Sequence, residues 1–252
     1  MNIQFASDLH LEIPKNNRYF QQEKIIPFAD ILILAGDTMC WDENYLQHPF
    51  WDEISSAFEQ VLVVPGNHEF YKGFDLASLH KSASGTIRNN VHWYYNQSIV
   101  FDGVQIILST LWSHIPLAIS ERIQSCGNDF TCIRYEERPI TIEKYNEENR
   151  FSIDYITTEL QKQYAKRIIV SHHAPIPEAI SEQLQNSWYA SLYANNLNEL
   201  IKNNSINYWI YGHSHQCKES FQVHGTELRT NPCGYISKKE NALFDSKKVL
   251  VL

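Results

Sequence analysis

The sequence predicts an α/β fold with mixed β-sheets, and three observations support this prediction. Short apolar runs recur, and each is closed by a polar cluster: NIQFA, ILILA, VLVVP, RIIV and INYWIY. Runs of this length, bounded by turn residues, are typical of buried strands. Helical candidates lie between them, and such alternation indicates a layered α/β architecture. Two hairpins, which turn at Asp102-Gly103 and His224-Gly225, add antiparallel pairs and make the sheets mixed.

In chain order, the five apolar runs place strands at residues 2–6, 31–35, 61–65, 167–170 and 206–211. The two hairpins occupy residues 98–108 and 220–230. Helices are expected over WDEISSAFEQ (51–60), TIEKYNEENRFSIDYITTEL (141–160) and SLYANNLNELIKNN (191–204). The length of 252 residues fits one large domain, so we expect a single domain over residues 1–252.

The stretch from Ser113 to about Tyr164 interrupts this alternation. It contains SCGNDFTCIRYEERP followed by the charged helical run, and long connections of this kind are often functional. The sequence leaves two interpretations open. The segment is an insertion that covers a catalytic face as a lid, or it forms surface helices that pack on a sheet.

Composition excludes several classes of protein. Hydrophobic residues make up 43% of the chain and charged residues 20%, as in ordinary globular proteins. The 21 basic and 29 acidic residues give a net charge of −8, which disfavours long nucleic acid as a partner. No apolar run approaches the ~18 residues that cross a bilayer. The N-terminus MNIQFASDLH has no basic or apolar signal region, so we expect a cytoplasmic protein.

The five cysteines form no CxxC pair, which disfavours a disulfide framework or a thiolate zinc site.

The polar clusters that follow the strands form one constellation. In open α/β sheets, ligands bind where neighbouring strands end, because side chains converge there. Carboxylate, amide and neutral imidazole groups at these ends are ligands that divalent transition metals accept. Seven such ligands exceed the need of one tetrahedral ion and suit two ions bridged by Asp37. The converging residues are Asp8, His10, Asp37, Asn67, His68, His172, His173, His213 and His215.

The order of these motifs resembles that of the calcineurin-like metallophosphoesterases. They are D-x-H at Asp8–His10, G-D at Gly36–Asp37, G-N-H-E at Gly66–Glu69, the histidines of SHHAP, and G-H-x-H at Gly212–His215. The resemblance implies a four-layer α/β/β/α sandwich with a dinuclear metal site. The neighbouring stretches SDLHLE, PGNHEFY, TLW and NPCGY are similar to a group of bacterial members of this superfamily.

Carried over by position, the resemblance implies that Asp8, His10 and His215 hold one metal ion. Asn67, His172 and His213 hold the other, and Asp37 bridges the two. The family implies two divalent ions, manganese first, with iron, zinc, nickel or magnesium as alternatives that these ligands do not distinguish.

Simpler interpretations remain for individual residues. Asp8 and Asp37 are also good helix N-caps, and Asn67 is also a good left-handed turn residue. Of His172 and His173 we expect one ligand. We favour His172, which is nearer the strand end, and assign His173 to substrate contact.

Two ions of this kind activate water and stabilise the oxygens of a phosphoryl transfer. With Asp8, Asp37 and a hydroxide counted, the loaded site keeps a charge of about +1, which attracts a phosphate ester. The resemblance gives His68 the catalytic role of protonating the leaving alkoxide or stabilising the phosphoryl oxygens.

The predicted function is therefore hydrolysis of a small phosphomonoester or phosphodiester. The sequence reads GDTMCWDE and PGNHE where phosphoprotein phosphatases have arginines, which disfavours that group. Tyr71, Trp112 and Tyr235 are candidates to stack on a substrate ring or to lie in the core, and Asn231 is a candidate substrate contact. Two alternatives remain, a non-catalytic interaction module that keeps the fold and a nuclease on short oligonucleotides. The sequence leaves the oligomeric state open.

Overall fold

Two six-stranded sheets face each other in the computed structural model of the protein, which describes residues 2–252. In the first sheet, an outer strand at each edge runs antiparallel to four parallel strands. Its order is β14 (Val249–Val251), β1 (Asn2–Ala6), β2 (Ile31–Ala35), β3 (Gln60–Val64), β5 (Val91–Tyr95) and β4 (Ala83–Arg88). The second sheet has the same design. Its order is β12 (Phe221–Val223), β13 (Thr226–Thr230), β11 (Tyr208–Tyr211), β10 (Lys166–Ser171), β7 (Val104–Ser109) and β6 (Gln97–Phe101).

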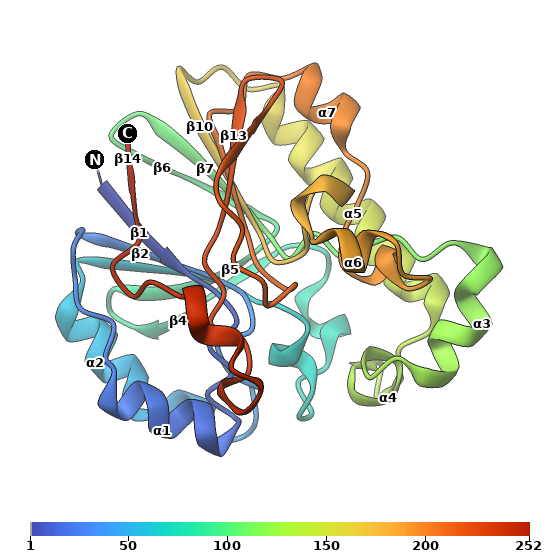
Figure 1. The fold of residues 1–252 in the computed structure, drawn as a ribbon, viewed down its shortest axis with the longest axis horizontal. Coiled ribbons are helices and arrows are strands. Elements are labelled where there is room, and N and C mark those ends of the chain that lie inside the picture. Colours follow the sequence, from blue (N-terminus) through green and yellow to red (C-terminus); the bar gives the residue numbers. More distant parts are fainter. Residues whose placement is uncertain (1) are drawn as a thin grey trace.

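Helices cover the outer face of each sheet, which completes the four-layer α/β/β/α sandwich (Figure 1). The first sheet is covered by α1 (Pro14–Gln22) and α2 (Pro49–Ala57), and the second by α5 (Ile142–Leu160) and α7 (Asn198–Lys202). Of the remaining helices, α3 (Leu117–Cys126) and α4 (Asp129–Cys132) lie at one end of the molecule, and the short α6 (Glu182–Gln185) lies near α5. Within residues 2–252, no helix has the length and apolar character needed to cross a membrane.

Burial on both faces explains why the predicted strands read as continuous apolar runs. In β2, Leu32 and Leu34 pack toward the helices, whereas Ile31 and Ile33 pack between the two sheets. Successive side chains point to opposite faces of a strand, so a sheet covered on both sides needs apolar residues at every position. The mixed sheets and the layered fold expected from the sequence are thus confirmed.

Both predicted hairpins are present, as β6–β7 and β12–β13. Asp102 and Gly103 have φ of 48° and 77°, and His224 and Gly225 have φ of 50° and 88°. Positive φ at both central residues is the requirement of the tight hairpin turn that matches strand twist.

The helix expected over residues 191–204 is wrong in extent, because α7 covers only Asn198–Lys202. The segment before it forms backbone hydrogen bonds with the loop after β10. Ala174 N donates to Tyr193 O, and Asn195 N donates to Ala174 O. These bonds pair Ala194 with Ala174 in a short bridge, which takes the place of the expected helix. The helix expected at 51–60 is shifted and spans Pro49–Ala57, since Pro suits the first helical position.

The segment 113–164 consists of two parts that pack against different regions of the molecule. Ile156 and Leu160 of α5 pack against the second sheet, as in the surface-helix interpretation. The part before α5 forms α3, α4 and the small hairpin β8 (Arg134–Tyr135) to β9 (Arg138–Pro139). Its apolar side chains share a separate core cluster with Phe70 and Tyr95 of the first half of the chain. Asp129 and Phe130 of α4 line the cavity described below.

Candidate metal centre and its cavity

The predicted metal ligands meet where five strands end. Asp8 follows β1, Asp37 follows β2, Asn67 follows β3, His172 follows β10, and His213 and His215 follow β11. The two sheets present these ends to one another, which brings residues over 200 positions apart into contact. His10 Nε2, for example, lies 2.8 Å from His215 Nε2.

Five of these residues adopt a backbone conformation that is costly for side chains other than glycine. The φ angles of Asp8, His10, Asp37, His213 and His215 lie between 50° and 69°. Strained conformations of this kind cluster at functional sites, where the surrounding structure enforces them. Among the helices of residues 2–252, none begins directly after Asp8 or Asp37, and Asn67 has an ordinary φ of −76°. The left-handed turn alternative for Asn67 is therefore wrong.

One ligand group consists of Asp8, His10, Asp37 and His215, whose ligand atoms all lie within 4.8 Å of one another. His10 Nδ1 lies 3.1 Å from Glu12 Oε1, and His215 Nδ1 lies 2.8 Å from Glu240 Oε2. Because a carboxylate only accepts, each Nδ1 carries the proton. The Nε2 atoms of His10 and His215 then carry no proton, and their lone pairs face each other.

The second group consists of Asp37, His172 and His213, with the Asn67 side chain beside them. His172 Nδ1 donates to Ala35 O and His213 Nε2 donates to Leu192 O. When both rings are neutral, this leaves His172 Nε2 and His213 Nδ1, 3.0 Å apart, without protons. Asn67 Oδ1 lies 3.1 Å from the same His172 Nε2. Three acceptors thus converge on one point, and Asp37 belongs to both groups.

Acceptors that face acceptors at these distances repel each other unless a cation lies between them. In each of these four histidines, the ring nitrogen that faces away from the group donates to a carboxylate or a backbone carbonyl. Histidines that bind a metal make this same hydrogen bond with their second nitrogen. The donor set therefore fits two divalent cations, with no cysteine in either group. Burial opposes protonation of His172, but Asp37 raises its pKa to about 9. A metal ion competes with that proton, so binding releases it.

Glu69 of the GNHE motif joins two of the ligand loops. Its buried carboxylate accepts from the backbone N–H of Asp37, Thr38 and Gly66. Gly66 is not among the glycines with positive φ, so its backbone conformation does not require glycine. A Cβ at Gly66 would lie 2.2 Å from Asp37 Oδ1. The glycine leaves room for the ligand.

Glu12 is a site residue that the sequence interpretation missed. Its Oε1 lies 3.1 Å from His10 Nδ1 and 2.9 Å from His68 Nδ1. Burial disfavours the charged form, but the hydrogen bonds from His10 and His68 hold the pKa of Glu12 at about 2. The D-x-H-x-E spacing of SDLHLE was the available signal. One carboxylate thus orients both a metal ligand and the candidate catalytic histidine.

His68 lies at the edge of the ligand groups and lines the cavity. Its backbone N–H donates to Asp37 Oδ1 at 2.9 Å, and its ring stacks on Tyr71 with 4.2 Å between centroids. Burial disfavours the imidazolium, yet Asp37, Cys40 and Glu12 raise the pKa of His68 well above its ordinary value. This raised pKa favours the protonated ring.

Asp129 connects the 113–164 segment to the metal ligands. Its Oδ1 accepts from Asn67 Nδ2 at 2.8 Å and from the Tyr71 hydroxyl. Because the Asn67 amide nitrogen points to Asp129, its oxygen must point to His172. A residue from the 113–164 segment therefore sets the orientation of a candidate ligand, and no strand-end motif marks it in the sequence.

Three residues are candidate substrate contacts: Tyr71, His173 and Asn231. Only Tyr71 lines the cavity. His173 is fully buried. Its Nε2 lies 3.3 Å from the Tyr145 hydroxyl and its Nδ1 lies 3.4 Å from Thr110 O. Burial and His172 lower the pKa of His173 to about 3. The Asn231 side chain donates to the Phe5 and Asp245 carbonyls, away from the ligand groups.

The other aromatic candidates divide in the same way. Trp112 is a fully buried core residue whose indole donates to Tyr95. Tyr235 lines the cavity, with its ring 4.5 Å from that of His215.

A cavity of about 580 Å³ opens over the ligand groups. This volume lies within the range of small-molecule sites, ~300–1,000 Å³. Its walls come from four segments of the chain, namely residues 127–130, 183–193, 213–216 and 235–240, together with the GNHE loop.

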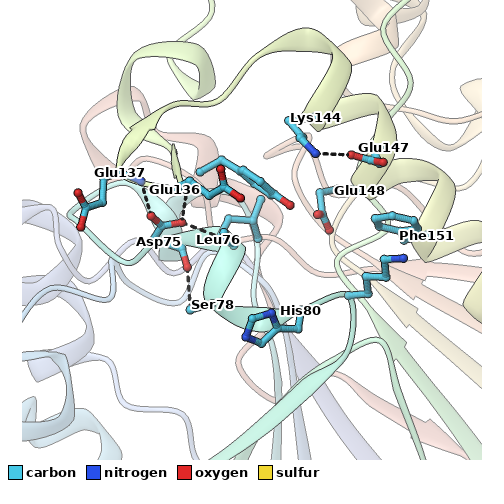
Figure 2. Close-up of a pocket in the computed structure, with 13 residues that line it drawn as sticks. Asp75, Leu76, Ser78, His80, Glu136, Glu137, Lys144, Glu147, Glu148 and Phe151 are labelled. Carbon is cyan, nitrogen blue, oxygen red and sulfur yellow. Dashed lines mark hydrogen bonds and ion pairs between the residues drawn. The ribbon is translucent and has the colours of Figure 1, made fainter.

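A second cavity, of about 800 Å³, lies beside α5 and the β8–β9 hairpin (Figure 2). Its lining has five carboxylates, including Glu147 and Glu148, against Lys81 and Lys144. Lys144 is paired with Glu147 at 2.8 Å. This excess of negative charge repels phosphate, and within residues 2–252 no candidate metal group includes a residue of this cavity. The smaller cavity is therefore the candidate substrate site.

Comparison with known families identifies the protein class. A sequence model described as calcineurin-like phosphoesterase matches residues 1–217. The chain belongs to this family. The match covers every ligand motif described above, from Asp8 to His215. Membership in the calcineurin-like phosphoesterases and the two ligand groups together support a dinuclear site for divalent metals.

The chain is also similar to individual proteins and solved structures. An uncharacterized protein of Acanthamoeba polyphaga mimivirus is 31% identical over 268 residues, which cover 95% of this chain and 93% of the relative. Among solved structures, a phosphopantetheinyl hydrolase from Mycobacterium tuberculosis superposes with a TM-score of 0.72 at 16% identity, over 98% of this chain and 94% of that one. A dimetal phosphatase from Danio rerio gives a TM-score of 0.49 at 13% identity, over 91% and 86%. The first of these structures supports the fold.

Proposed function

We propose that this calcineurin-like phosphoesterase hydrolyses small phosphate esters with two divalent metal ions, manganese first. The observation that supports the proposal is the convergence of unprotonated ring nitrogens and oxygens in two groups that share Asp37. In this proposal Asp8, His10 and His215 hold one ion, Asn67, His172 and His213 hold the other, and Asp37 bridges them.

When bound, two such ions supply a nucleophile from water near neutral pH and neutralise charge on the phosphoryl oxygens. The remaining roles, which are proton donation and orientation of the groups involved, belong to residues of the chain. His68, on the cavity wall, donates a proton to the leaving oxygen. Glu12 holds the His68 ring through Nδ1, so its Nε2 is free to face the substrate. We propose that residues 127–130 of the inserted segment cover part of the site, where Asp129 orients Asn67.

The decisive experiment is to strip the protein of metal and reload it with manganese, nickel, zinc or magnesium. Elemental analysis should find two ions per chain, and chromogenic mono- and diesters should be hydrolysed only after reloading. Two bound ions without hydrolysis of any ester would contradict the proposal and favour a non-catalytic interaction module.

Replacing Glu12 with glutamine should lower kcat by about 10- to 100-fold, the usual effect of removing a hydrogen-bond partner behind a metal ligand. The pH profile gives a second measurement. As a general acid, His68 must be protonated, so activity is lost as pH rises through its pKa. Glu12 helps to raise that pKa. Its removal should therefore move the alkaline limb of kcat/KM to lower pH. The exposed Glu219→Gln serves as the control, and an unchanged limb would contradict the assignment.

A further inference from the structure

The two ligand groups open onto different walls of the cavity. The His213 ring lies 5.0 Å from that of Tyr193, and His213 Nε2 lies 3.2 Å from Leu192 O. The His215 ring lies 4.5 Å from that of Tyr235, and its Nδ1 bonds Glu240. In Figure 1, α6 lies to one side of these strand ends and the C-terminal turns Ile236–Lys238 and Glu240–Leu243 lie to the other. A group held over both sets of ligands thus has one aromatic wall on each side.

The cavity carries little positive charge of its own. Apart from histidines, Lys238 is the one cationic side chain among the residues that line it, and its ammonium is 4.0 Å from Glu240. Asp129 adds a further carboxylate at the cavity wall. Once Asp8 and Asp37 are counted against two divalent cations and a hydroxide, about one positive charge remains to attract the substrate.

One neutral hydrogen-bond donor, Ser214, lies at the cavity, where arginines are absent. Ser214 stands between His213 and His215, is 6% exposed, and lines the cavity. Its hydroxyl has no hydrogen-bond partner among residues 2–252. A buried hydroxyl without a partner is costly unless a ligand supplies one. A single neutral donor suits a phosphoryl group of low charge better than a dianion.

We infer that the substrate is a phosphodiester with one negative charge. Its two ester substituents, called arms below, lie one against the Tyr193 wall and the other against the Tyr235 wall. The inference rests on the proposed function. In the reaction, the oxygen of a water molecule forms a bond to phosphorus and the P–O bond to one ester group breaks. The departing oxygen takes a proton from His68. Of the two protons that the water loses, one returns to His68 and the other is released to solvent, so the products are an alcohol and a phosphomonoester. The monoester is a dianion, and the cavity holds it less well than the substrate.

The test compares ligands that differ in charge and in number of arms. Diphenylphosphinate has one negative charge and two arms, and phenylphosphonate has two charges and one arm. Neither contains an ester bond. Calorimetry on the manganese-loaded protein, above the second ionisation of phenylphosphonate, should show tighter binding of diphenylphosphinate. Tyr193→Ala and Tyr235→Ala should both weaken it. Tighter binding of phenylphosphonate would overturn the inference.

A matched pair of variants tests the charge argument separately. Gln216 lines the cavity, and Gln222 lies exposed on β12 outside it. Gln216→Arg should improve phenylphosphonate binding relative to diphenylphosphinate by about fivefold, as expected for one more unit charge at ~4 Å in water. Gln222→Arg adds the same charge and should leave the ratio unchanged. Equal ratios in both variants would contradict the charge argument.

Product analysis distinguishes the two levels of the proposal. Bis(p-nitrophenyl) phosphate should yield one nitrophenolate per molecule, without inorganic phosphate. Faster hydrolysis of p-nitrophenyl phosphate, with release of inorganic phosphate, would refute the diester inference and leave the proposed hydrolase function intact. Failure on both esters with two ions bound would instead refute the proposed function.

Discussion

His68→Ala is expected to lower kcat by ~10²–10⁴-fold, the usual contribution of general acid catalysis, while both metal ions stay bound. The ring of His68 belongs to neither of the two groups that share Asp37. The contact between residue 68 and the bridging carboxylate is made by the backbone N–H, at 2.9 Å, and alanine keeps it. The variant therefore loses the proton donor and the stacking on Tyr71 without losing a ligand.

The choice of leaving group reveals which role His68 has. A p-nitrophenolate leaves without protonation, whereas an alkoxide needs a proton. If His68 is the general acid, the loss of kcat in His68→Ala is much larger for an alkyl ester than for the nitrophenyl ester. If the ring instead stabilises the phosphoryl oxygens, the two losses are similar. His114→Ala, at an exposed histidine, is the control. Turnover near the wild-type rate on both esters would remove His68 from the mechanism.

The convergence of the candidate metal ligands could be predicted because each of them follows a strand of the fold. Each follows an apolar run that must be a buried strand, and parallel strands end at the same edge. The positions of Asp37 after ILILA and of His213 after INYWIY can be predicted without knowing the conformation of the loops. The choice of His172 over His173 also follows from position, and the structure places His172 in a ligand group and turns the ring of His173 toward Tyr145.

The residues that orient the ligands could not be predicted in this way. Glu240 forms a hydrogen bond with His215, although the two residues are 25 positions apart in the sequence. Asp129 contacts Asn67 from a segment whose path depends on tertiary packing. Their partners are set by contacts between distant loops, which periodicity does not encode. The shortened α7 has a similar cause, because extended pairing with the loop after β10 replaces a helix that the local sequence allows.

Asp37→Asn should abolish the dinuclear site, with the largest effect of any single change. Asp37 Oδ1 lies 3.4 Å from His172 Nε2 and Oδ2 lies 3.8 Å from His10 Nε2, so the two oxygens serve different groups. The amide oxygen can still accept from His68 N–H, but the new NH₂ group cannot bind a cation. We expect one ion or fewer per chain by elemental analysis. The kcat should fall by about 10³-fold or more, because an ion contributes several kcal/mol and ~1.4 kcal/mol is tenfold.

Thermal stability gives a measure of the same loss that does not depend on turnover. Ions that bind only the folded chain stabilise it, by ~2.7 kcal/mol at a concentration of 100 Kd. For a chain of this size, that corresponds to a rise in Tm of ~5–10 °C for each ion. In Asp37→Asn most of this metal-dependent rise should disappear. Asp154→Asn makes the same chemical change on the exposed face of α5 and should keep the full rise. If Asp37→Asn bound two ions with the wild-type gain in Tm, the two groups would not share a bridging carboxylate, and the dinuclear centre would have to be rebuilt without it.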